Sequence, residues 1–248
     1  MITKQQIADG YDKIAEKIYV SDEFYNEVMA IEKNWHGDVL DAGCGQGPVL
    51  QKLAKFLKEN SKPQFPNHKQ IQNFYPEQNR GTKSQIQRLV GIDISEKLLE
   101  MARQRVPEAE ILKADIDAMP FPDNSFDFVI MVDVFQYLLD FGRVLEEVRR
   151  VLKPDGKFIV TVPNKNWLLF DSYIKRRKNI QPVEDHFFTF DEMAGLLKKH
   201  GFKIATYRGA DCFRYYKPYH KYEMWLAMVL PFMHKRMKKI IFKAVKAG

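Results

Sequence analysis

The chain is poor in cysteine and in long apolar runs, and both absences limit what it can be. Cys44 and Cys212 are the only cysteines in 248 residues, too few for a disulfide framework, so a reducing compartment is expected. The apolar segment Met224–Met233 has about half of the ~20 residues that a membrane-spanning helix needs, and it contains Pro231. The polar start, Met1–Asp9, lacks the apolar core of a signal peptide. These absences favour a cytoplasmic protein.

Positive charge is concentrated near the end of the chain. The formal net charge is +7, and residues 214–248 hold nine Lys or Arg against a single acid, Glu223. The rest of the chain is therefore close to neutral. With 45% hydrophobic residues, a chain of this length can bury an ordinary α/β core. We expect one domain that covers residues 1–248.

The most informative segment is Val39–Gly47, in which an apolar strand runs into a turn with glycines at 43, 45 and 47. Glycine adopts dihedrals closed to other residues and lets the backbone approach a ligand closely. A helix-like run, Pro48–Leu57, follows, so the turn points a helix N-terminus at whatever is bound. The segment predicts a nucleotide-type site.

The spacing of the glycines separates two families that use such a turn. Dinucleotide-binding dehydrogenases carry G-x-G-x-x-G, whereas this turn reads G-x-G-x-G, with Asp41 two residues before Gly43. The arrangement resembles motif I of the class I S-adenosylmethionine-dependent methyltransferases. The resemblance implies S-adenosyl-L-methionine as the cofactor.

Two further acids follow predicted strands. Leu89–Ser95 is an apolar strand that ends at Asp93, before a helix over 96–103, and its carboxylate suits the two hydroxyl donors of a ribose. A third strand is predicted over Glu110–Ile116. By resemblance, Asp115 accepts a hydrogen bond from the adenine amine and Ile116 lines the face of the ring.

Two later segments extend the resemblance to residues 38–162. Residues 119–131 predict a turn and a buried parallel strand. Residues 148–162 predict a helix end, a turn at 154–156 and a fifth strand. The segment Lys239–Val245 is a candidate last strand. The resemblance implies an α/β fold: a Rossmann-like, seven-stranded, mostly parallel sheet with helices on both faces and an antiparallel last strand.

The N-terminal segment Tyr11–Tyr19 resembles the lead-in helix of small-molecule methyltransferases. The resemblance implies that Tyr11 hydrogen-bonds the methionine carboxylate of the cofactor and that Asp41 helps to hold its ammonium. An amphipathic cover helix with partly buried tyrosines is the alternative for this segment. The full predicted cofactor set is Tyr11, Asp41, Gly43, Cys44, Gly45, Gly47, Asp93, Ile94, Asp115, Ile116 and Met131.

Residues 58–88 are rich in Gln, Asn, Lys and Pro and have few aliphatic side chains. Such a stretch cannot bury enough apolar surface to order itself. We interpret it as a mobile polar insertion between the first helix and the second strand, with a partner-binding segment as the alternative.

A methyl group on a sulfonium is already activated, so its transfer requires mainly alignment and exclusion of water. A protonated acceptor also needs a base. His186 lies in the connection 182–190, which covers the substrate pocket in related enzymes, and histidine titrates near neutrality; a surface or capping histidine is the alternative. Asp133 is a second candidate. Many relatives place a histidine soon after strand four, where this chain reads Asp133–Tyr137. No metal site is predicted.

A substrate cap is predicted over about 163–190 and 210–236. Aromatic residues are frequent there and would line a pocket for an apolar acceptor, or build the cap's own core. They are Trp167, Phe170, Tyr173, Phe187, Phe188, Phe190, Phe213, Tyr215 and Tyr216. The basic tail suits contact with an anionic membrane surface, although Met224–Met233 as a core helix is the competing interpretation. A nucleic-acid substrate is disfavoured. The segment after strand four lacks the Asn/Asp-Pro-Pro-Tyr/Phe signature of enzymes that methylate exocyclic amines of bases or amide nitrogens.

The sequence therefore predicts an S-adenosylmethionine-dependent methyltransferase that acts on a small, aromatic or lipid-like acceptor. The resemblance is to the enzymes of quinone and lipid biosynthesis. Methylation of a polar metabolite, sugar or peptide is the first alternative. A non-catalytic protein that keeps the cofactor pocket as a scaffold is the second, and a nicotinamide-dependent dehydrogenase the third. The oligomeric state stays open.

Overall fold

The computed structural model describes residues 3–18, 22–60, 86–167, 170–176, 182–210 and 231–247. Its strands are β1 (Gly37–Ala42), β2 (Ile86–Asp93), β3 (Glu110–Lys113), β4 (Phe126–Met131), β5 (Leu152–Pro163), β6 (Phe202–Ala210) and β7 (Lys239–Lys246). Its α-helices are α1 (Lys4–Ile14), α2 (Asp22–Met29), α3 (Pro48–Asn60), α4 (Glu96–Arg105), α5 (Phe141–Val151), α6 (Phe170–Arg176) and α7 (Phe190–Lys199). Short 3-10 turns lie at η1 (Ala15–Lys17), η3 (Phe135–Tyr137) and η4 (Pro231–Arg236).

The strands form one seven-stranded sheet in the order β3-β2-β1-β4-β5-β7-β6. Strands β1 to β5 pair in parallel, and β7 is antiparallel to both of its neighbours, β5 and β6. The central strand is β1, in which Val39 pairs with Leu89 on one side and with Phe128 on the other. The predicted sheet is confirmed, including its antiparallel last strand.

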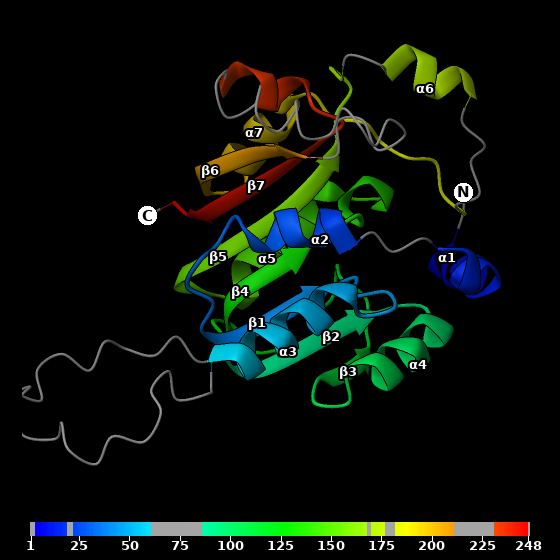
Figure 1. Ribbon diagram of the computed structural model, residues 1–248, viewed down its shortest axis with the longest axis vertical. Coiled ribbons are helices and arrows are strands. Elements are labelled where there is room, and N and C mark those ends of the chain that lie inside the picture. The colour runs from blue at the N-terminus through cyan, green and yellow to red at the C-terminus, as the bar shows by residue number, and fades with distance from the viewer. Residues whose placement is uncertain are drawn as a thin grey trace, which may run out of the picture.

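Alternate side chains of the central strands belong to two different cores, one on each face of the sheet. Val39, Phe128 and Ile130 pack with α2, α3 and α4, and Figure 1 shows α2 and α3 in front of the sheet. Leu40 and Val129 pack on the other face with α5 and α7. Because helices cover both faces of the sheet, the sequences of these strands are largely continuous apolar runs and do not alternate between apolar and polar residues.

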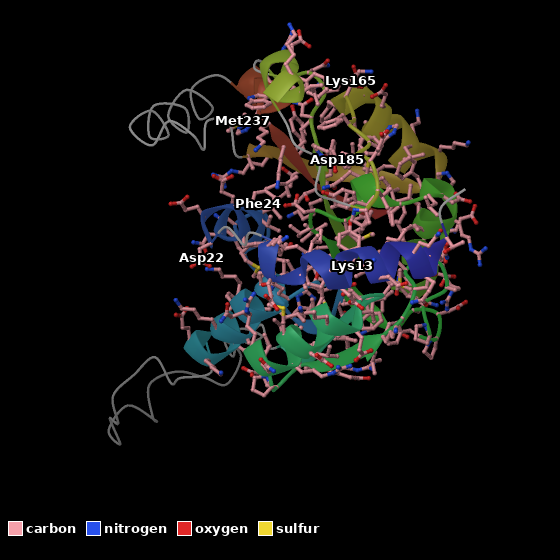
Figure 2. All side chains as sticks on the ribbon, turned by 90° about the vertical axis from the view of Figure 1, so that its right-hand side faces the viewer. Lys13, Asp22, Phe24, Lys165, Asp185 and Met237 are labelled. Carbon is pink, nitrogen blue, oxygen red and sulfur yellow. The ribbon has the colours of Figure 1, made fainter. Side chains whose placement is uncertain are left out.

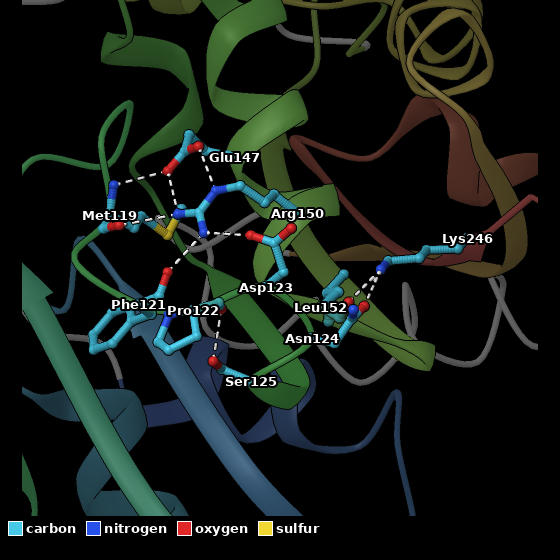
Figure 3. Close-up of polar contacts among 10 residues, drawn as sticks. All are labelled: Met119, Phe121, Pro122, Asp123, Asn124, Ser125, Glu147, Arg150, Leu152 and Lys246. Atoms are coloured by element: carbon cyan, nitrogen blue, oxygen red, sulfur yellow. Dashed lines mark hydrogen bonds and ion pairs between the residues drawn. The ribbon is translucent and has the colours of Figure 1, made fainter.

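The loop that leads into β4 is held by one arginine of α5 (Figure 3). The Arg150 guanidinium donates to the carbonyl oxygens of Met119, at 3.0 Å, and Phe121, at 2.6 Å. It also pairs with Glu147 at 2.8 Å and with Asp123 at 3.0 Å. A planar guanidinium suits such a network because its five N–H groups point in fixed directions. The network fixes the end of the sheet opposite to the predicted cofactor turn.

Several predicted boundaries differ from the structure. The third strand ends at Lys113 and not at Ile116, and the N-terminal helix covers Lys4–Ile14 and not Tyr11–Tyr19. Residues 58–60 belong to α3 and residues 86–88 to β2, so the predicted insertion is narrower than 58–88; residues 61–85 lie outside the described residues. The predicted turn at 154–156 lies within β5, which begins at Leu152. The register shifts between the pairs Phe126–Leu152 and Phe128–Lys157, so an irregularity inside the strand accommodates Pro154, which lacks an N–H donor.

The C-terminal predictions are only partly covered. The candidate strand Lys239–Val245 is confirmed as β7. Most of Met224–Met233, and with it the choice between a core helix and a membrane-contacting one, lies outside the described residues. Within the ranges that the structure describes, no helix has the length and apolar character to span a membrane.

Candidate cofactor and acceptor site

A cavity of about 570 Å³ opens where the parallel strands end. This edge is the usual ligand site of an open α/β sheet. One part, which we name the cofactor half, is lined by Tyr11, Asp41, Gly43, Cys44, Gly45, Gln46, Asp93, Ile94, Asp115 and Ile116. The other, the acceptor half, is lined by Asp133, Gln136, Tyr137, Trp167, Phe170, Asp185, Phe187, Lys238 and Lys239. The two halves are continuous.

The glycine turn after β1 has the backbone that its sequence predicts. Gly43, Gly45 and Gly47 have φ of +81°, +51° and +77°, a region that favours glycine. The N–H groups of Gly43 and Cys44 donate to the Ile92 carbonyl at 2.8 and 2.9 Å. A Cβ on Gly43 would lie 2.5 Å from a methyl group of Val134. The turn is therefore fixed between β2 and the segment after β4.

Asp93 is held by backbone donors at the end of β2. Its Oδ2 accepts from the Gly45 N–H and its Oδ1 from the Ser95 N–H, both at 3.0 Å. Burial raises the pKa of the Asp93 carboxyl, and the backbone N–H groups act against that rise. Each oxygen retains acceptor capacity, so the carboxylate is oriented toward the cavity and can still receive two hydroxyl groups.

Asp41 and Tyr11 carry buried polar atoms that lack a partner among the described residues. These atoms are Asp41 Oδ2 and the Tyr11 hydroxyl oxygen. Burial, followed by the charge of Asp93, raises the pKa of Asp41 to about 8. Buried polar groups are rarely left unpaired in native proteins. A bound cation beside Asp41 and a polar group beside Tyr11 would satisfy both, so these residues fit the methionine end of S-adenosylmethionine.

Helix α1 lies against the cofactor half through several polar contacts. Figure 2 shows this helix, labelled at Lys13, below Asp185. Asp12 Oδ1 accepts from the Ser95 hydroxyl at 2.5 Å and from the Lys97 N–H at 3.2 Å. The Gln46 side chain donates to the Ala15 carbonyl at 2.7 Å, just beyond the helix. These contacts bring Tyr11 to the cavity.

Lys4 adds an ion pair that the sequence did not predict. Its Nζ lies 2.5 Å from Asp115 Oδ2 and also bonds Asp117. Partial burial raises the pKa of Asp115, but the Lys4 ammonium outweighs it and leaves the pKa below its ordinary value. Asp115, the predicted adenine partner, therefore already holds a cation, and Ile116 lines the cavity beside it.

Asp133, predicted as a catalytic group, lies in the acceptor half. Its φ is +57°, which is uncommon for a residue other than glycine and is typical of strained functional positions. The backbone N–H donates to Thr161 Oγ1 at 2.9 Å, and Oδ2 pairs with Lys239 Nζ at 2.5 Å. The Lys239 ammonium also lies 3.9 Å from the ring centroid of Phe24. The carboxylate is thus ion-paired.

His186, the other predicted catalytic residue, is exposed and is not among the residues that line this cavity. Its backbone N–H donates to the Gln136 carbonyl at 3.0 Å. Its ring packs against Phe188 and Phe141, with centroid distances of 4.4 and 5.1 Å. Asp185 lines the cavity in its place, so the placement of His186 in the pocket is not supported.

Two predicted cofactor residues have other positions. Met131 is fully buried in the core on the α5 side of the sheet, and the next residue, Val132, lines the cavity. Gly47 shapes the turn but does not line the cavity, and a Cβ on it would meet Ala102 at 3.2 Å. Cys44 does line it, and burial raises the pKa of its thiol.

The aromatic cap residues divide between the cavity and the core. Trp167, Phe170 and Phe187 line the acceptor half. Phe188 belongs to the core, and the Phe190 ring packs 4.7 Å from that of Tyr207. The side chain of Tyr173, and all of Phe213, Tyr215 and Tyr216, lie outside the described part. Three of these aromatics therefore line the cavity, whereas Phe188 and Phe190 pack in the main core of the sheet and not in a separate core of the cap.

The sequence reasoning missed Gln136, Tyr137, Asp185, Lys4 and Lys239. Gln136 and Tyr137 could have been predicted from the sequence, because they are polar residues among large apolar ones directly after a predicted strand. No local signal marks Lys4 or Lys239, because each acquires its role only from a partner more than a hundred residues away.

Comparisons with known proteins agree with this geometry. A family profile described as a methyltransferase domain matches residues 77–160. The chain is 26% identical over 172 residues to a probable S-adenosylmethionine-dependent methyltransferase of Mycolicibacterium smegmatis, a match that covers 69% of this chain and 54% of that protein. It spans about half the length of the first curated relatives that it matches.

A further relative matches over most of both proteins. The ubiquinone/menaquinone biosynthesis C-methyltransferase UbiE of Rickettsia bellii is 27% identical over 234 residues, which is 82% of this chain and 84% of that protein. Among solved structures, an S-adenosylmethionine-dependent methyltransferase of Thermotoga maritima superimposes with a TM-score of 0.66 at 18% identity, and the match covers 97% of this chain and 99% of that one. The profile and the relatives make this chain similar to the S-adenosylmethionine-dependent methyltransferases, and the solved structure has the same fold.

Proposed function

We propose that this protein transfers a methyl group from S-adenosylmethionine to a small, aromatic acceptor. The observation that carries the proposal is the continuity of the cavity, in which the cofactor half joins an acceptor half walled by Trp167, Phe170 and Phe187. Rings and apolar walls with a few convergent polar groups are typical of small-molecule sites. The relatives named as quinone methyltransferases support an acceptor of this class.

Six residues of the cofactor half have a defined task in this proposal. Asp93 accepts from the ribose hydroxyls, and Asp41 balances the methionyl ammonium from its buried position. Gly43 and Gly45 keep the backbone close enough for contact, and Asp115 and Ile116 hold the adenine. The sulfonium supplies an activated methyl group, so the chain has mainly to align the acceptor and exclude water.

The acceptor half supplies orientation and charge rather than an evident base. Asp133 is paired with Lys239, and the hydroxyls of Tyr11 and Tyr137 keep their protons, because burial, followed by nearby acids, raises the pKa of both. Methylation of a hydroxyl group releases its proton, which would pass to water because the described residues of the acceptor half offer no evident base.

A ligand titration tests the cofactor part of this proposal. Binding of S-adenosylmethionine and S-adenosylhomocysteine, but not of NAD, should raise the melting temperature, because a ligand that binds only the native state stabilises it. Stabilisation by NAD alone would favour a dehydrogenase instead. Absence of any shift in folded protein would contradict a working cofactor site.

Labelled-methyl transfer then tests the acceptor class. Quinols and naphthols should be methylated in preference to sugars, peptides and polar amines. Methylation of a polar metabolite alone would support the alternative acceptor class, and cofactor binding without any transfer would support the scaffold function.

Peripheral contact with a membrane extends the proposal. Lys235, Arg236 and Lys238 lie together before β7, and Arg236 is exposed. Clustered basic residues attract anionic lipid. Cosedimentation with vesicles of phosphatidylglycerol should exceed that with phosphatidylcholine, and equal recovery would contradict the contact.

A further inference from the structure

The place where the two halves of the cavity meet contains a polar atom that the proposed function does not use. Gln136 is 6% exposed, yet it lines the cavity and its Oε1 has no hydrogen-bond partner among the described residues. The backbone around it is fixed, because the Gln136 carbonyl accepts from the His186 N–H and the 3-10 turn Phe135–Tyr137 encloses it. A buried oxygen held in this way is expected to find its partner in a bound molecule.

Tyr11 and Tyr137 line the same cavity as Gln136. The Tyr11 and Tyr137 rings meet edge to face, with centroids 6.1 Å apart. Burial raises the pKa of Tyr11 most, followed by the charges of Asp93 and Asp185. Because Tyr11 lines the cofactor half and its ring contacts Tyr137 of the acceptor half, the two tyrosines lie at the boundary between the halves.

The surroundings of Tyr137 place Gln136 at the same boundary. Tyr137 is the next residue in the same 3-10 turn, and burial, then the charges of Asp185, Tyr11 and Asp133, raises the pKa of its hydroxyl. The amide oxygen is the end of the Gln136 side chain that is buried without a partner among the described residues. A free carbonyl oxygen accepts hydrogen bonds and donates none.

We propose that Gln136 is a specificity-determining residue that receives an O–H or N–H group of the acceptor molecule next to the transferred methyl group. The aromatic walls hold the ring of that molecule, and Gln136 Oε1 fixes its rotation through one hydrogen bond. The acceptor class is thus narrowed to apolar ring compounds that carry a hydrogen-bond donor. This inference rests on the proposed methyltransferase function.

A pair of stable probes isolates this hydrogen bond. 1-Naphthol carries an O–H donor, and 1-methoxynaphthalene has nearly the same shape without one. Their affinities are measured by calorimetry on the full chain in the presence of saturating S-adenosylhomocysteine. Wild type should prefer 1-naphthol by ~10-fold, because a buried acceptor discriminates strongly against a ligand that leaves it unpaired.

Three variants give the test its contrast. Gln136→Met keeps the length of the side chain and removes the acceptor oxygen, so the preference should fall below ~2-fold while S-adenosylhomocysteine affinity is unchanged. Gln136→Glu keeps an acceptor, so the preference should persist and should grow as the carboxyl ionises with rising pH. Gln104→Met, at an exposed position of α4, is the matched control and should behave as wild type.

The possible results separate this inference from the function on which it rests. If wild type fails to bind S-adenosylhomocysteine, the proposed function is overturned, and this inference with it. If the cofactor product binds but wild type and Gln136→Met show the same preference, only this inference is overturned. Loss of S-adenosylhomocysteine binding in Gln136→Met would also overturn it, since Gln136 would then serve the cofactor. Loss of the preference in Gln136→Glu would contradict the role of the oxygen as acceptor.

Discussion

The two halves of the cavity are built in different ways. In the cofactor half, Asp41 and Asp93 lie at the ends of β1 and β2, and Asp115 lies two residues after β3. Asp93 accepts from backbone N–H groups, Asp41 Oδ2 has no partner among the described residues, and Asp115 pairs with Lys4. In the acceptor half, the lining comes from segments far apart in the chain, and Asp133 is joined to Lys239 at the start of β7. The acids of the cofactor half recur at the ends of neighbouring strands, whereas the acceptor half is formed by residues that are far apart in the sequence.

This difference predicts how substitutions should divide. Changes in the cofactor half should act on cofactor affinity, and changes in the acceptor half should act on turnover while cofactor affinity stays constant. Residues that touch both halves, such as Tyr11, are where this separation should fail.

The largest effect is expected at Asp93. Asp93→Ala removes the oriented carboxylate, so S-adenosylhomocysteine affinity should fall by roughly 100-fold or more, as expected for the loss of two charge-assisted hydrogen bonds. Calorimetry measures the affinity, and Asp9→Ala, at an exposed position of α1, is the control. A loss below tenfold would mean that the ribose is held elsewhere.

Asp41→Asn should separate stability from binding. The pKa of Asp41 is about 8 in the folded protein against an ordinary 3.8, so the folded state binds an extra proton between these values. The stability associated with this proton is complete below the lower value and is lost as the pH rises through about 8. Asparagine removes this loss.

In urea titrations, Asp41→Asn should therefore be more stable than wild type at pH 8 by ~1–3 kcal/mol, with a smaller difference at pH 5. Cofactor affinity should decrease, because the counter-charge for the ammonium is gone. An unchanged pH dependence of stability would show that another group is responsible.

Lys239→Met should affect only the acceptor half. It leaves Asp133 partly buried without its cation, and a loss of ~1 kcal/mol of stability is expected. Turnover should fall while S-adenosylhomocysteine affinity stays within ~2-fold of wild type, well under the ~1.4 kcal/mol that a tenfold change represents. Lys243→Met is the matched control, because Lys243 lies on the same strand as Lys239 but pairs with Glu32. Equal loss of turnover in both variants would assign the effect to β7 as a whole.

A smaller effect is expected at Lys4. Its side chain is 46% exposed, and exposed ion pairs contribute ~0–1 kcal/mol, so Lys4→Met should alter stability little. Because Asp115 no longer holds a cation, S-adenosylmethionine affinity should rise by ~2–5-fold, about 0.4–1 kcal/mol. A clear loss of affinity would show instead that closure of α1 over the site outweighs the competition for Asp115.

The smallest effect is expected at His186. Since its ring packs outside the cavity lining, His186→Ala should change turnover by less than ~2-fold, and the pH profile should keep its shape. A large loss, together with a missing ionisation near neutrality, would restore the catalytic role that its sequence position suggested.

The sequence alone determined the sheet and the cofactor half. Apolar runs that end in Asp41 or Asp93, and glycines at 43, 45 and 47, encode both the strand and the group at its end within a few residues. Such information is local, because a parallel strand delivers its last residues to the same edge of the sheet wherever it lies in the order. Even there, the prediction of Met131 as a cavity residue is wrong by one position, because its neighbour Val132 lines the cavity.

Only the tertiary structure decided the acceptor half and the state of its charges. The His186 ring packs against Phe141 of α5, and the pairing of Asp133 depends on a strand that begins more than a hundred residues later. Lys4 likewise forms an ion pair with Asp115, although the two residues are far apart in the sequence. Burial and partner identity set the pKa and hydrogen bonding of these groups. Neither is a property of the residue itself or of its neighbours in sequence.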